Sequence, residues 1–440
     1  MLDLAAIVVR EGSWTDPLSA LAPFAEEPFA ACLLSGGEDA RWSYVLRAPL
    51  AITHDVADLR APPLAAGGEG GPPFQGGWLG LATYEFGAAF EPAQPQTRTD
   101  WPDLTAALYP ALLAFDHQAR RVLAVGRGGG ESEAGARAEQ ALGWLDHARV
   151  PEPLAGYLSD DFACDTPAAD YERAVAQVVA GIGAGEIFQA NIARLWSGRL
   201  RVGAAPFELF ARLSGTSMAP LAAYLRLPHR AVVSNSPERF ISVDARGLAR
   251  TQPIKGTRPR GTSPDADRAL AADLAASAKD RAENLMIVDL MRNDLARACT
   301  PGTVTVPSLF AMESFANVHH LVSTVEGRLA PGQGALDLFT SAFPPGSITG
   351  APKVQAMRVI ARHETPRGPY CGSIFWLGLD GAFDSSVLIR TLACVEDEGG
   401  WRIEARAGAG IVADSDPRSE RRETEAKLAS IVLALKGGAA

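Results

Sequence analysis

The sequence predicts a fold of the α+β class, because segments with the periodicity of helices are interspersed with short segments that have the composition of strands. The helical pattern is clearest over residues 171–182 and 279–297. Residues 231–234, 386–394 and 401–407 are rich in the β-branched and aromatic residues that are frequent in strands. This mixture is typical neither of a helix bundle nor of a sandwich alone, and 440 residues are enough for two or three domain-sized units.

The N-terminal part of the chain is rich in loops. Residues 62–77 abound in proline and glycine, which predicts an exposed loop that leads into a strand over residues 78–84. After a glycine run at residues 128–130, the pattern predicts a helix over residues 131–147. Prolines interrupt the chain again soon after this helix.

We expect the main boundary of the chain between about residues 150 and 165. The N-terminal region, residues 1–150, has many loops, whereas residues 165–437 alternate clear helices and strands. The last helix is predicted to begin after Asp416, a favourable capping residue followed by proline at the first helical position, and to continue to about Leu435.

The composition excludes several classes of function. The formal charge of −10 opposes binding to nucleic acid or to an anionic membrane surface, so an anionic substrate needs local cations, backbone N–H groups or a metal. No apolar run is long enough for a membrane span and the N-terminus lacks the pattern of a signal peptide, which predicts a cytoplasmic protein. The scattered cysteines predict neither a disulfide framework nor a zinc site: Cys32, Cys164, Cys299, Cys371 and Cys394.

A basic loop over residues 253–261 contains Lys255, Arg258 and Arg260, together with glycines that let the backbone approach a ligand closely. By itself such a loop is more often a solvated part of the surface. Glu238 lies upstream, beyond a hairpin-like turn, so antiparallel neighbours could bring it close to Lys255, although a surface ion pair would leave the same pattern.

Two predicted helices each carry carboxylates on one face. Asp280 and Glu283 are three residues apart, and so are Glu420 and Glu423. In isolation, such carboxylates are more often ordinary solvated residues. The apolar run after Glu283 nevertheless indicates that the first of these helices is buried, where a carboxylate needs a partner or a metal. Two such helices would form an oxygen-rich site suited to Mg²⁺.

Two loops of small residues, 343–353 and 406–410, have backbone N–H groups that could hold a carboxylate or a phosphate. Neither matches the glycine pattern of a nucleotide-binding loop, so nucleotide binding is not predicted. The sequence also shows no nucleophile elbow of a glutaminase, so ammonia would come from solution or from a separate amidotransferase.

Five segments resemble, in the same order, the chorismate-utilising enzymes. This family includes the anthranilate synthase large subunit, aminodeoxychorismate synthase component I, isochorismate synthase and salicylate synthase. The resemblance is strong over roughly residues 171–435 and looser before them, and it implies an anthranilate-synthase-like chorismate-binding fold. In that fold, large and mostly antiparallel sheets form a sandwich with helices packed outside. The segments are residues 283–294, 318–323, 349–353, 389–391 and 407–410.

Two positions favour the aminodeoxychorismate synthases within this family. Lys255 stands where anthranilate synthases carry a small residue. Gln189 stands near the position of a lysine that activates water in isochorismate and salicylate synthases, and a glutamine cannot take a proton. Anthranilate synthase component I is the nearest alternative. An alternative of a different class is a non-catalytic regulatory subunit that binds chorismate or tryptophan.

The resemblance implies a double displacement on chorismate. Neutral Lys255 would attack ring carbon 2 while Glu238, as general acid, helps the hydroxyl to leave carbon 4; ammonia would then add at carbon 4 and expel the lysine. The lysine therefore needs a lowered pKa and the glutamate a raised one. His320 and Thr257 match family positions around the ring, where they would orient ammonia or contact the substrate. The alternative for His320 is an ordinary buried histidine.

The resemblance also assigns the metal and substrate ligands. Glu283 and Glu423 would bind Mg²⁺ directly, while Asp280 and Glu420 would hold its waters. The ion would grip the ring carboxylate. Residues from several segments would bind the substrate's carboxylates: Arg390, Thr349, Gly350, Gly408, Ala409, Gly410 and Lys427.

The sequence departs from the family after residues 371–374, where Phe375 and Trp376 replace the usual Gly-Tyr pair. We expect the Trp376 N–H to substitute for a missing tyrosine hydroxyl at the substrate carboxylate. In the N-terminal region, residues 32–36 resemble a family strand that lines a tryptophan pocket, which makes tryptophan a candidate ligand there. The missing glutaminase segment implies a heterodimer with a glutamine amidotransferase subunit.

Overall fold

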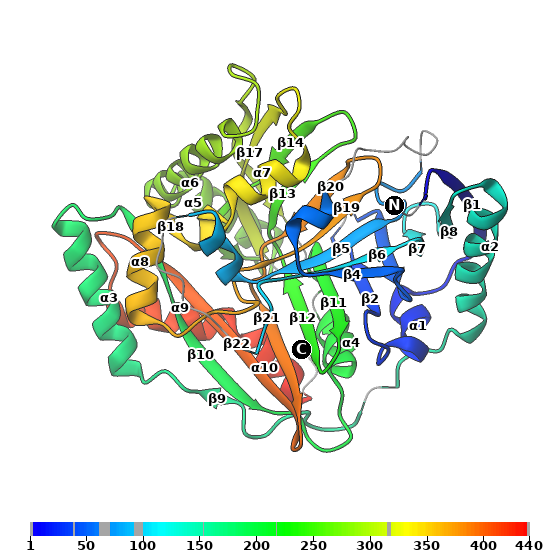
Figure 1. Cartoon of the computed structure of the whole chain (residues 1–440). Coiled ribbons are helices and arrows are strands. Elements are labelled where there is room, and N and C mark those ends of the chain that lie inside the picture. The colour runs from blue at the N-terminus through cyan, green and yellow to red at the C-terminus, as the bar shows by residue number, and fades with distance from the viewer. Residues whose placement is uncertain are drawn as a thin grey trace.

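Two large antiparallel sheets pack against each other and carry helices on their outer faces (Figure 1). The computed structural model describes residues 3–37, 40–60, 71–91, 100–152, 154–216, 218–314 and 318–437. Residues 62–70 of the loop predicted at 62–77 lie outside the described residues, as does Pro153.

The first sheet contains strands from both ends of the chain, and β2 of the N-terminal region pairs with β11 of the C-terminal region. Its described strands run, in spatial order, β1 (Ala6–Ser13), β8 (Arg121–Gly128), β7 (Ala111–Asp116), β3 (Trp42–Leu46), β2 (Ala31–Leu34), β11 (Leu221–Leu227), β12 (Arg230–Ser236), β21 (Thr391–Asp397), β22 (Gly400–Ile411), β10 (Gln189–Arg199) and β18 (Gly350–Ala351). The short strand β9 (Ala163–Cys164) pairs with β10 outside this order.

The second sheet is also shared, because β5 of the N-terminal region pairs with β19. Its described strands run β15 (Ile254–Pro259), β17 (Val318–Arg328), β14 (Leu248–Thr251), β13 (Arg239–Val243), β20 (Phe383–Ser386), β19 (Ser373–Gly378), β5 (Gly77–Ala82), β6 (Leu104–Tyr109) and β4 (Ala51–Thr53). The strand β16 (Thr305–Ser314) pairs with β17 beside this path.

Three apolar layers hold the sandwich together. The middle layer lies between the sheets, where Tyr44 and Leu225 of the first meet Leu81 and Ile374 of the second. The two outer layers lie under helices. The helices are α1 (Pro17–Leu21), α2 (Glu131–Leu142), α3 (Ala168–Gly183), α4 (Pro206–Thr216), α5 (Pro264–Ala276), α6 (Ala278–Ala296), α7 (Ala335–Ala342), α8 (Lys353–His363), α9 (Pro417–Lys427) and α10 (Ala429–Lys436).

The structure confirms most of the predicted elements and divides three of them. The helices predicted at 171–182 and 279–297 correspond to α3 and α6, and the helix at 131–147 corresponds to α2 with a short 3₁₀ turn. The last helix is interrupted at Leu428, which separates α9 from α10.

The prediction of one continuous strand over residues 386–394 was wrong. β20 of the second sheet ends at Ser386 and β21 of the first sheet begins at Thr391, so the chain crosses between the sheets within this segment. Arg390, the last residue of the crossing, has a left-handed backbone with φ of 52°. Composition could not reveal the break because all these residues suit a strand.

The predicted boundary at residues 150–165 falls in the segment that precedes α3. Both sheets contain strands from either side of it, and the pairs β2–β11 and β5–β19 join the two regions. Among the described helices, none combines the length and the apolar character that a membrane span requires.

Candidate active site

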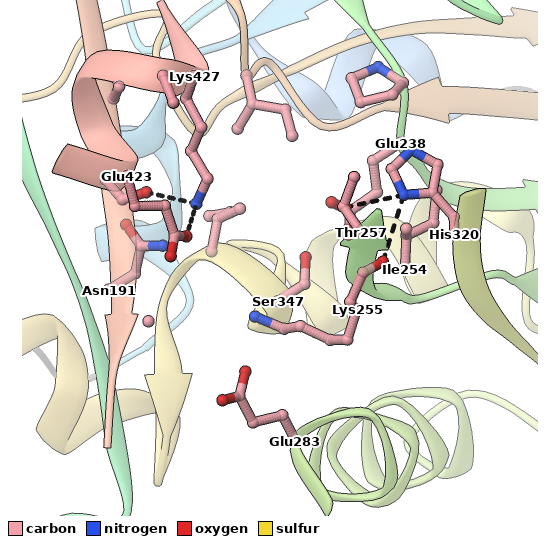
Figure 2. Close-up of a pocket in the computed structure, with 18 of the residues that line it drawn as sticks. Asn191, Glu238, Ile254, Lys255, Thr257, Glu283, His320, Ser347, Glu423 and Lys427 are labelled. Carbon is pink, nitrogen blue, oxygen red and sulfur yellow. Dashed lines mark hydrogen bonds and ion pairs between the residues drawn. The ribbon is translucent and has the colours of Figure 1, made fainter. Parts of the chain in front are cut away.

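A cavity of about 670 Å³ lies where strands of both sheets meet α6 and α9. Its lining brings together side chains that are far apart in the sequence (Figure 2). Most of the predicted site residues line it: Glu238, Lys255, Thr257, Asp280, Glu283, His320, Arg390, Gly408, Gly410, Glu420, Glu423 and Lys427.

Lys255 extends into this cavity from β15, and its side chain approaches Glu283 and Ser347 in Figure 2. The pairing of β15 with β17 is irregular after Lys255, at Gly256, which has a φ of 77°. A side chain at Gly256 would meet Leu274 at 2.8 Å and Asp280 at 3.0 Å, so only glycine fits. Burial lowers the pKa of Lys255, although Glu283 partly opposes this shift. Burial therefore shifts the equilibrium of this amine towards its uncharged, nucleophilic form.

Glu238 lies in the connection between β12 and β13 and is buried. Burial raises its pKa, while a hydrogen bond from Ser347 and the charge of Lys255 act in the opposite direction. A carboxyl that keeps its proton above its usual range can act as a general acid. The cavity thus combines an amine that readily loses a proton with a carboxyl that readily holds one.

Thr257 and His320 form a pair on the adjacent strands β15 and β17, as the dashed lines in Figure 2 show. The Thr257 Oγ1 atom is 3.0 Å from His320 Nδ1, and the carbonyl oxygen of Gly256 is 3.4 Å from the same nitrogen. Burial lowers the pKa of His320, so the neutral imidazole is favoured. Its ring can therefore position a neighbouring group without adding a charge.

The four predicted metal ligands line the cavity from two helices. Asp280 and Glu283 come from α6, which begins where Ser277 accepts a hydrogen bond from the Asp280 N–H, and Glu420 and Glu423 come from α9. The predicted burial of α6 holds for one face, which includes Ile287, Val288 and Met291, whereas Leu285 of its apolar run is 45% exposed. The two carboxylates of each helix share a face because they are three residues apart.

Each of these carboxylates lies near a cation: Arg258 Nη2 is 3.3 Å from Asp280 Oδ2, and lysines lie near the other three. Burial raises the pKa of Glu283 and of Glu420, and neighbouring carboxylates add to both shifts. Burial alone would also raise the pKa of Glu423, but Lys427, with Nζ 2.7 Å from Oε1, outweighs it and the net shift is downward. Lys279 is 3.9 Å from Glu283.

The donor set has the chemistry that Mg²⁺ prefers, namely carboxylate oxygens from two helices. Mutual repulsion among Asp280, Glu283 and Glu423 contributes to the raised pKa of Glu283, which a bound cation would relieve. In the described chain, no three acidic, histidine or cysteine side chains are already grouped as a metal site. A bound metal ion would compete with the neighbouring cations, such as Arg258 at Asp280 and Lys427 at Glu423, for these carboxylates.

The glycine-rich end of β22 contributes only part of the predicted carboxylate-binding loop. Gly408 and Gly410 line the cavity, whereas Ala409 points to the opposite face of the strand, into an apolar cluster with α3 and α8. Lys427 Nζ donates to the carbonyl oxygen of Gly408 at 2.9 Å. Burial lowers the pKa of the Arg390 guanidinium, and no described side chain forms an ion pair with it. A substrate carboxylate would supply the missing counter-ion.

The structure places Thr349 and Gly350 outside the lining. Thr349 is fully buried and its hydroxyl donates to the carbonyl oxygen of Pro345 at 2.9 Å. Gly350 pairs with Ala190 in the β10–β18 ladder. Ser347 and Ile348 line the cavity instead. The predicted segment therefore borders the cavity through residues of the 3₁₀ turn over Gly346–Ile348, not through Thr349 and Gly350.

Trp376 also lies outside the cavity, so its predicted role at the substrate carboxylate is corrected. Successive residues of β19 face opposite sides, which directs Trp376 into the layer between the sheets, where it stacks on Phe74 with ring centroids 5.0 Å apart. The tyrosine in the cavity is Tyr370, which sequence reasoning missed although it directly precedes the Cys371 segment. A side chain at Gly408 would come within 3.0 Å of its hydroxyl.

Sequence reasoning also missed Asn191 and Arg406, which line the cavity from β10 and β22. The side-chain oxygen of Asn191 is buried and has no hydrogen-bond partner among the described residues. Gln189, two residues earlier on the same face of β10, is buried with both amide atoms similarly unpartnered. Its amide nitrogen lies against Gly410, beside Lys255 Nζ.

A second cavity, of about 270 Å³, lies beside the strand for which a tryptophan pocket was predicted. Leu33, Leu34 and Ser35 line it together with Tyr44 and Trp376. The predicted strand therefore borders a cavity that is separate from the one around Lys255.

Comparisons with known proteins give one consistent result. Residues 26–433 match the family model described as chorismate binding enzyme. The chain is 41% identical to aminodeoxychorismate synthase component 1 of Salmonella typhimurium, over 83% of this chain and 78% of that protein. It is 38% identical to anthranilate synthase component 1 of Streptomyces coelicolor, over 92% of this chain and 82% of that protein.

Solved structures agree with the predicted architecture. The crystal structure of anthranilate synthase component I from Streptococcus pneumoniae superposes with a TM-score of 0.77, at 28% identity, over 90% of this chain and 93% of that one. The isochorismate synthase MenF of Escherichia coli gives a TM-score of 0.73 at 19% identity, over 99% of this chain and 96% of that one. This match shows a similarity of fold. These matches confirm the expected anthranilate-synthase-like fold with two antiparallel sheets and outer helices.

Proposed function

The chain belongs to the chorismate-binding enzymes, and on this premise we propose that it is the chorismate-aminating subunit of a 4-amino-4-deoxychorismate synthase. The observation that carries the proposal is Lys255, an amine with a lowered pKa in the same cavity as Glu238, a carboxyl with a raised pKa. This is the pair that a covalent amination requires.

In the first step, the Lys255 Nζ atom attacks carbon 2 of chorismate. The C2–N bond forms, the two conjugated ring double bonds both shift towards carbon 4, and the C4–O bond breaks while Glu238 gives its proton to the leaving hydroxyl, which departs as water. In the second step, ammonia adds at carbon 4, both double bonds shift back, and the C2–N bond breaks. Lys255 leaves with its electron pair, a proton from ammonia returns to Glu238, and the product keeps the configuration at carbon 4.

Other residues of the cavity would orient the ring. Arg390 and Tyr370 offer a guanidinium and a hydroxyl for a substrate carboxylate, and the backbone of Gly408 to Gly410 lies beside them. The neutral His320, held by Thr257, would orient ammonia or contact the ring. Glu283 and Glu423 would hold Mg²⁺, with Asp280 and Glu420 around it, and the bound ion would neutralise the ring carboxylate.

We also propose that ammonia comes from a glutamine amidotransferase subunit and that the two proteins form a heterodimer in the cytoplasm. The relatives named component 1 support this, as does the lack of a glutaminase nucleophile motif in the sequence. The second cavity, beside residues 33–35, is the proposed place for tryptophan. Calorimetric titration with tryptophan tests that part independently of turnover, and a Tyr44→Ala variant should weaken the binding.

The deciding experiment is incubation with chorismate, Mg²⁺ and an ammonium salt, followed by identification of the product by mass spectrometry. Aminodeoxychorismate as the product supports the proposal. Anthranilate as the product would instead indicate an anthranilate synthase component 1, the alternative suggested by the similarity to that protein. Binding of chorismate without turnover would select the non-catalytic alternative.

A further inference from the structure

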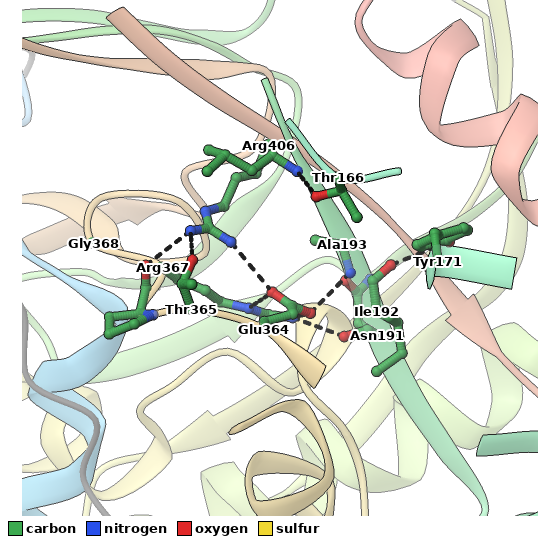
Figure 3. A network of polar contacts seen from close by, with 12 residues as sticks. Thr166, Tyr171, Asn191, Ile192, Ala193, Glu364, Thr365, Arg367, Gly368 and Arg406 are labelled. Atoms are coloured by element: carbon green, nitrogen blue, oxygen red, sulfur yellow. Dashed lines mark hydrogen bonds and ion pairs between the residues drawn. The ribbon is translucent and has the colours of Figure 1, made fainter. Parts of the chain in front are cut away.

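A buried ion pair between Glu364 and Arg367, drawn in Figure 3, is hydrogen-bonded to residues that line one wall of the active-site cavity. The side chains of Glu364 and Arg367 are 2% and 1% exposed, and neither residue lines the cavity. Glu364 follows the end of α8, and its two oxygens accept from Arg367 Nη2 at 2.8 Å and Nε at 3.0 Å. Such a buried, bidentate pair is geometrically rigid.

The carboxylate of Glu364 joins two strands that bear cavity residues. Its Oε1 atom also accepts from the backbone N–H of Ala193 on β10 at 2.8 Å. Its Oε2 atom lies 3.8 Å from Nη1 of Arg406 on β22. Arg406 in turn donates from Nη2 to the Thr365 hydroxyl at 2.6 Å and to the Pro366 carbonyl at 3.0 Å. Arg406 lines the cavity, so residues 364–366, which follow α8, hold in place a guanidinium group of the cavity wall.

Arg367 extends the same network to three more residues of the wall. Its Nη2 donates to the backbone carbonyl of Asn191 at 2.7 Å, and its Nη1 to that of Ile348 at 3.2 Å. Its guanidinium carbon lies 5.6 Å from the ring centroid of Tyr370. Asn191, Ile348 and Tyr370 all line the cavity. One ion pair therefore contacts residues from four separate segments of one wall.

We propose that Glu364 is a positioning residue for substrate binding, which acts through Arg367 and Arg406. It holds the Arg406 guanidinium, the Asn191 amide and the Tyr370 hydroxyl in the arrangement that receives a carboxylate of the substrate. Loss of its charge would leave two buried guanidinium groups without their shared counter-ion, and they would move or draw in water. This inference rests on the proposed function, because it takes chorismate as the ligand of this wall.

The test is calorimetric titration of the full chain with chorismate in the presence of Mg²⁺ and without ammonia. Glu364→Gln keeps the shape of the side chain but removes its charge, and we expect the Kd for chorismate to rise about tenfold. In turnover assays, KM should rise by a similar factor while kcat changes less. Thr365→Val removes only the hydroxyl acceptor of Arg406 and should raise the Kd by about two- to threefold.

Asp294→Asn is the matched control. Asp294 and its partner Lys353 are similarly buried, at 3% and 4%, with oxygen–nitrogen distances of 2.9 Å, and neither lines the cavity. Its loss should lower the melting temperature without changing the Kd. The proposal is overturned if folded Glu364→Gln binds as tightly as wild type, or if Asp294→Asn weakens binding equally. Should Glu364→Gln fail to fold, unchanged binding by Thr365→Val overturns it.

A wild-type chain that does not bind chorismate would overturn the proposed function and this inference with it. If the wild-type chain binds chorismate and folded Glu364→Gln binds it equally tightly, only the inference about Glu364 is overturned. The two failures are therefore distinguishable in the same titration.

Discussion

Lys427 reaches Glu423 across one turn of α9, with Nζ 2.7 Å from Oε1, and the same ammonium donates to the carbonyl oxygen of Gly408 at 2.9 Å. One lysine thus links a proposed metal ligand to the proposed substrate-binding strand. Mg²⁺ and substrate binding should be coupled through this contact, because an ion at Glu423 competes with Lys427 for the carboxylate.

Magnesium should raise the melting temperature of the chain, because a ligand that binds only the folded state stabilises it. Glu283→Gln and Glu423→Gln should each abolish this increase, and chelation should remove activity. Asp289→Asn, an exposed residue of α6 paired with Arg292, is the control and should keep both properties. A wild-type melting curve that does not respond to Mg²⁺ would contradict the assignment.

Replacement of Lys255 by alanine should lower the rate of aminodeoxychorismate formation by a factor on the order of 10³ or more, since it removes the nucleophile. Residual turnover should shift towards anthranilate, because ammonia would then react without the covalent step. Product analysis by mass spectrometry measures both effects. Unchanged kinetics would exclude a covalent role for this lysine.

The pH dependence should report both titrating groups. Burial lowers the pKa of Lys255, and the rate should rise with pH because the reaction needs the uncharged amine. Burial raises the pKa of Glu238, and the rate should fall at higher pH because the reaction needs the protonated carboxyl. A bell-shaped profile of kcat/KM is expected at a constant concentration of unprotonated ammonia. The Glu238→Gln variant should be about 10²–10⁴-fold slower than wild type, and its kcat/KM should rise with pH without falling again. A falling limb that persists in this variant would assign it to another group.

The isolated chain should use ammonium salts but not glutamine as its nitrogen source. Addition of a glutamine amidotransferase subunit should restore glutamine-dependent turnover, with glutamate released in equal amount. Coupled measurement of glutamate and aminodeoxychorismate tests this. Turnover of glutamine by the chain alone would contradict the proposal of a separate partner.

Long periodic segments were predicted well because their pattern is local. α3 and α6 follow from the apolar spacing at 171–182 and 279–297, and the paired carboxylates of α6 and α9 follow from intervals of three residues. The interruption between Ser386 and Thr391 could not be read from composition, since a strand that leaves one sheet for another keeps the same residue types.

Two of the predicted site residues that do not line the cavity, Trp376 and Ala409, differ from the prediction in the direction of their side chains. Trp376 and Tyr370 belong to one short segment, yet only Tyr370 reaches the cavity, because the alternation of β19 turns Trp376 towards Phe74. Ala409 lies between two glycines that line the cavity and faces away from it for the same reason.

The amino-acid sequence alone identified the family, through five segments that resemble the chorismate-utilising enzymes in the same order, and it supplied Lys255, Glu238 and the acidic helix faces as candidate site residues. The order of strands in space determined which of these groups share a cavity and which are buried. Burial sets the direction of the Lys255 and Glu238 pKa shifts, and burial is a property of the packed chain. Only the tertiary structure decides the contacts of the Glu364–Arg367 pair, because its partners come from separate segments that the fold brings together.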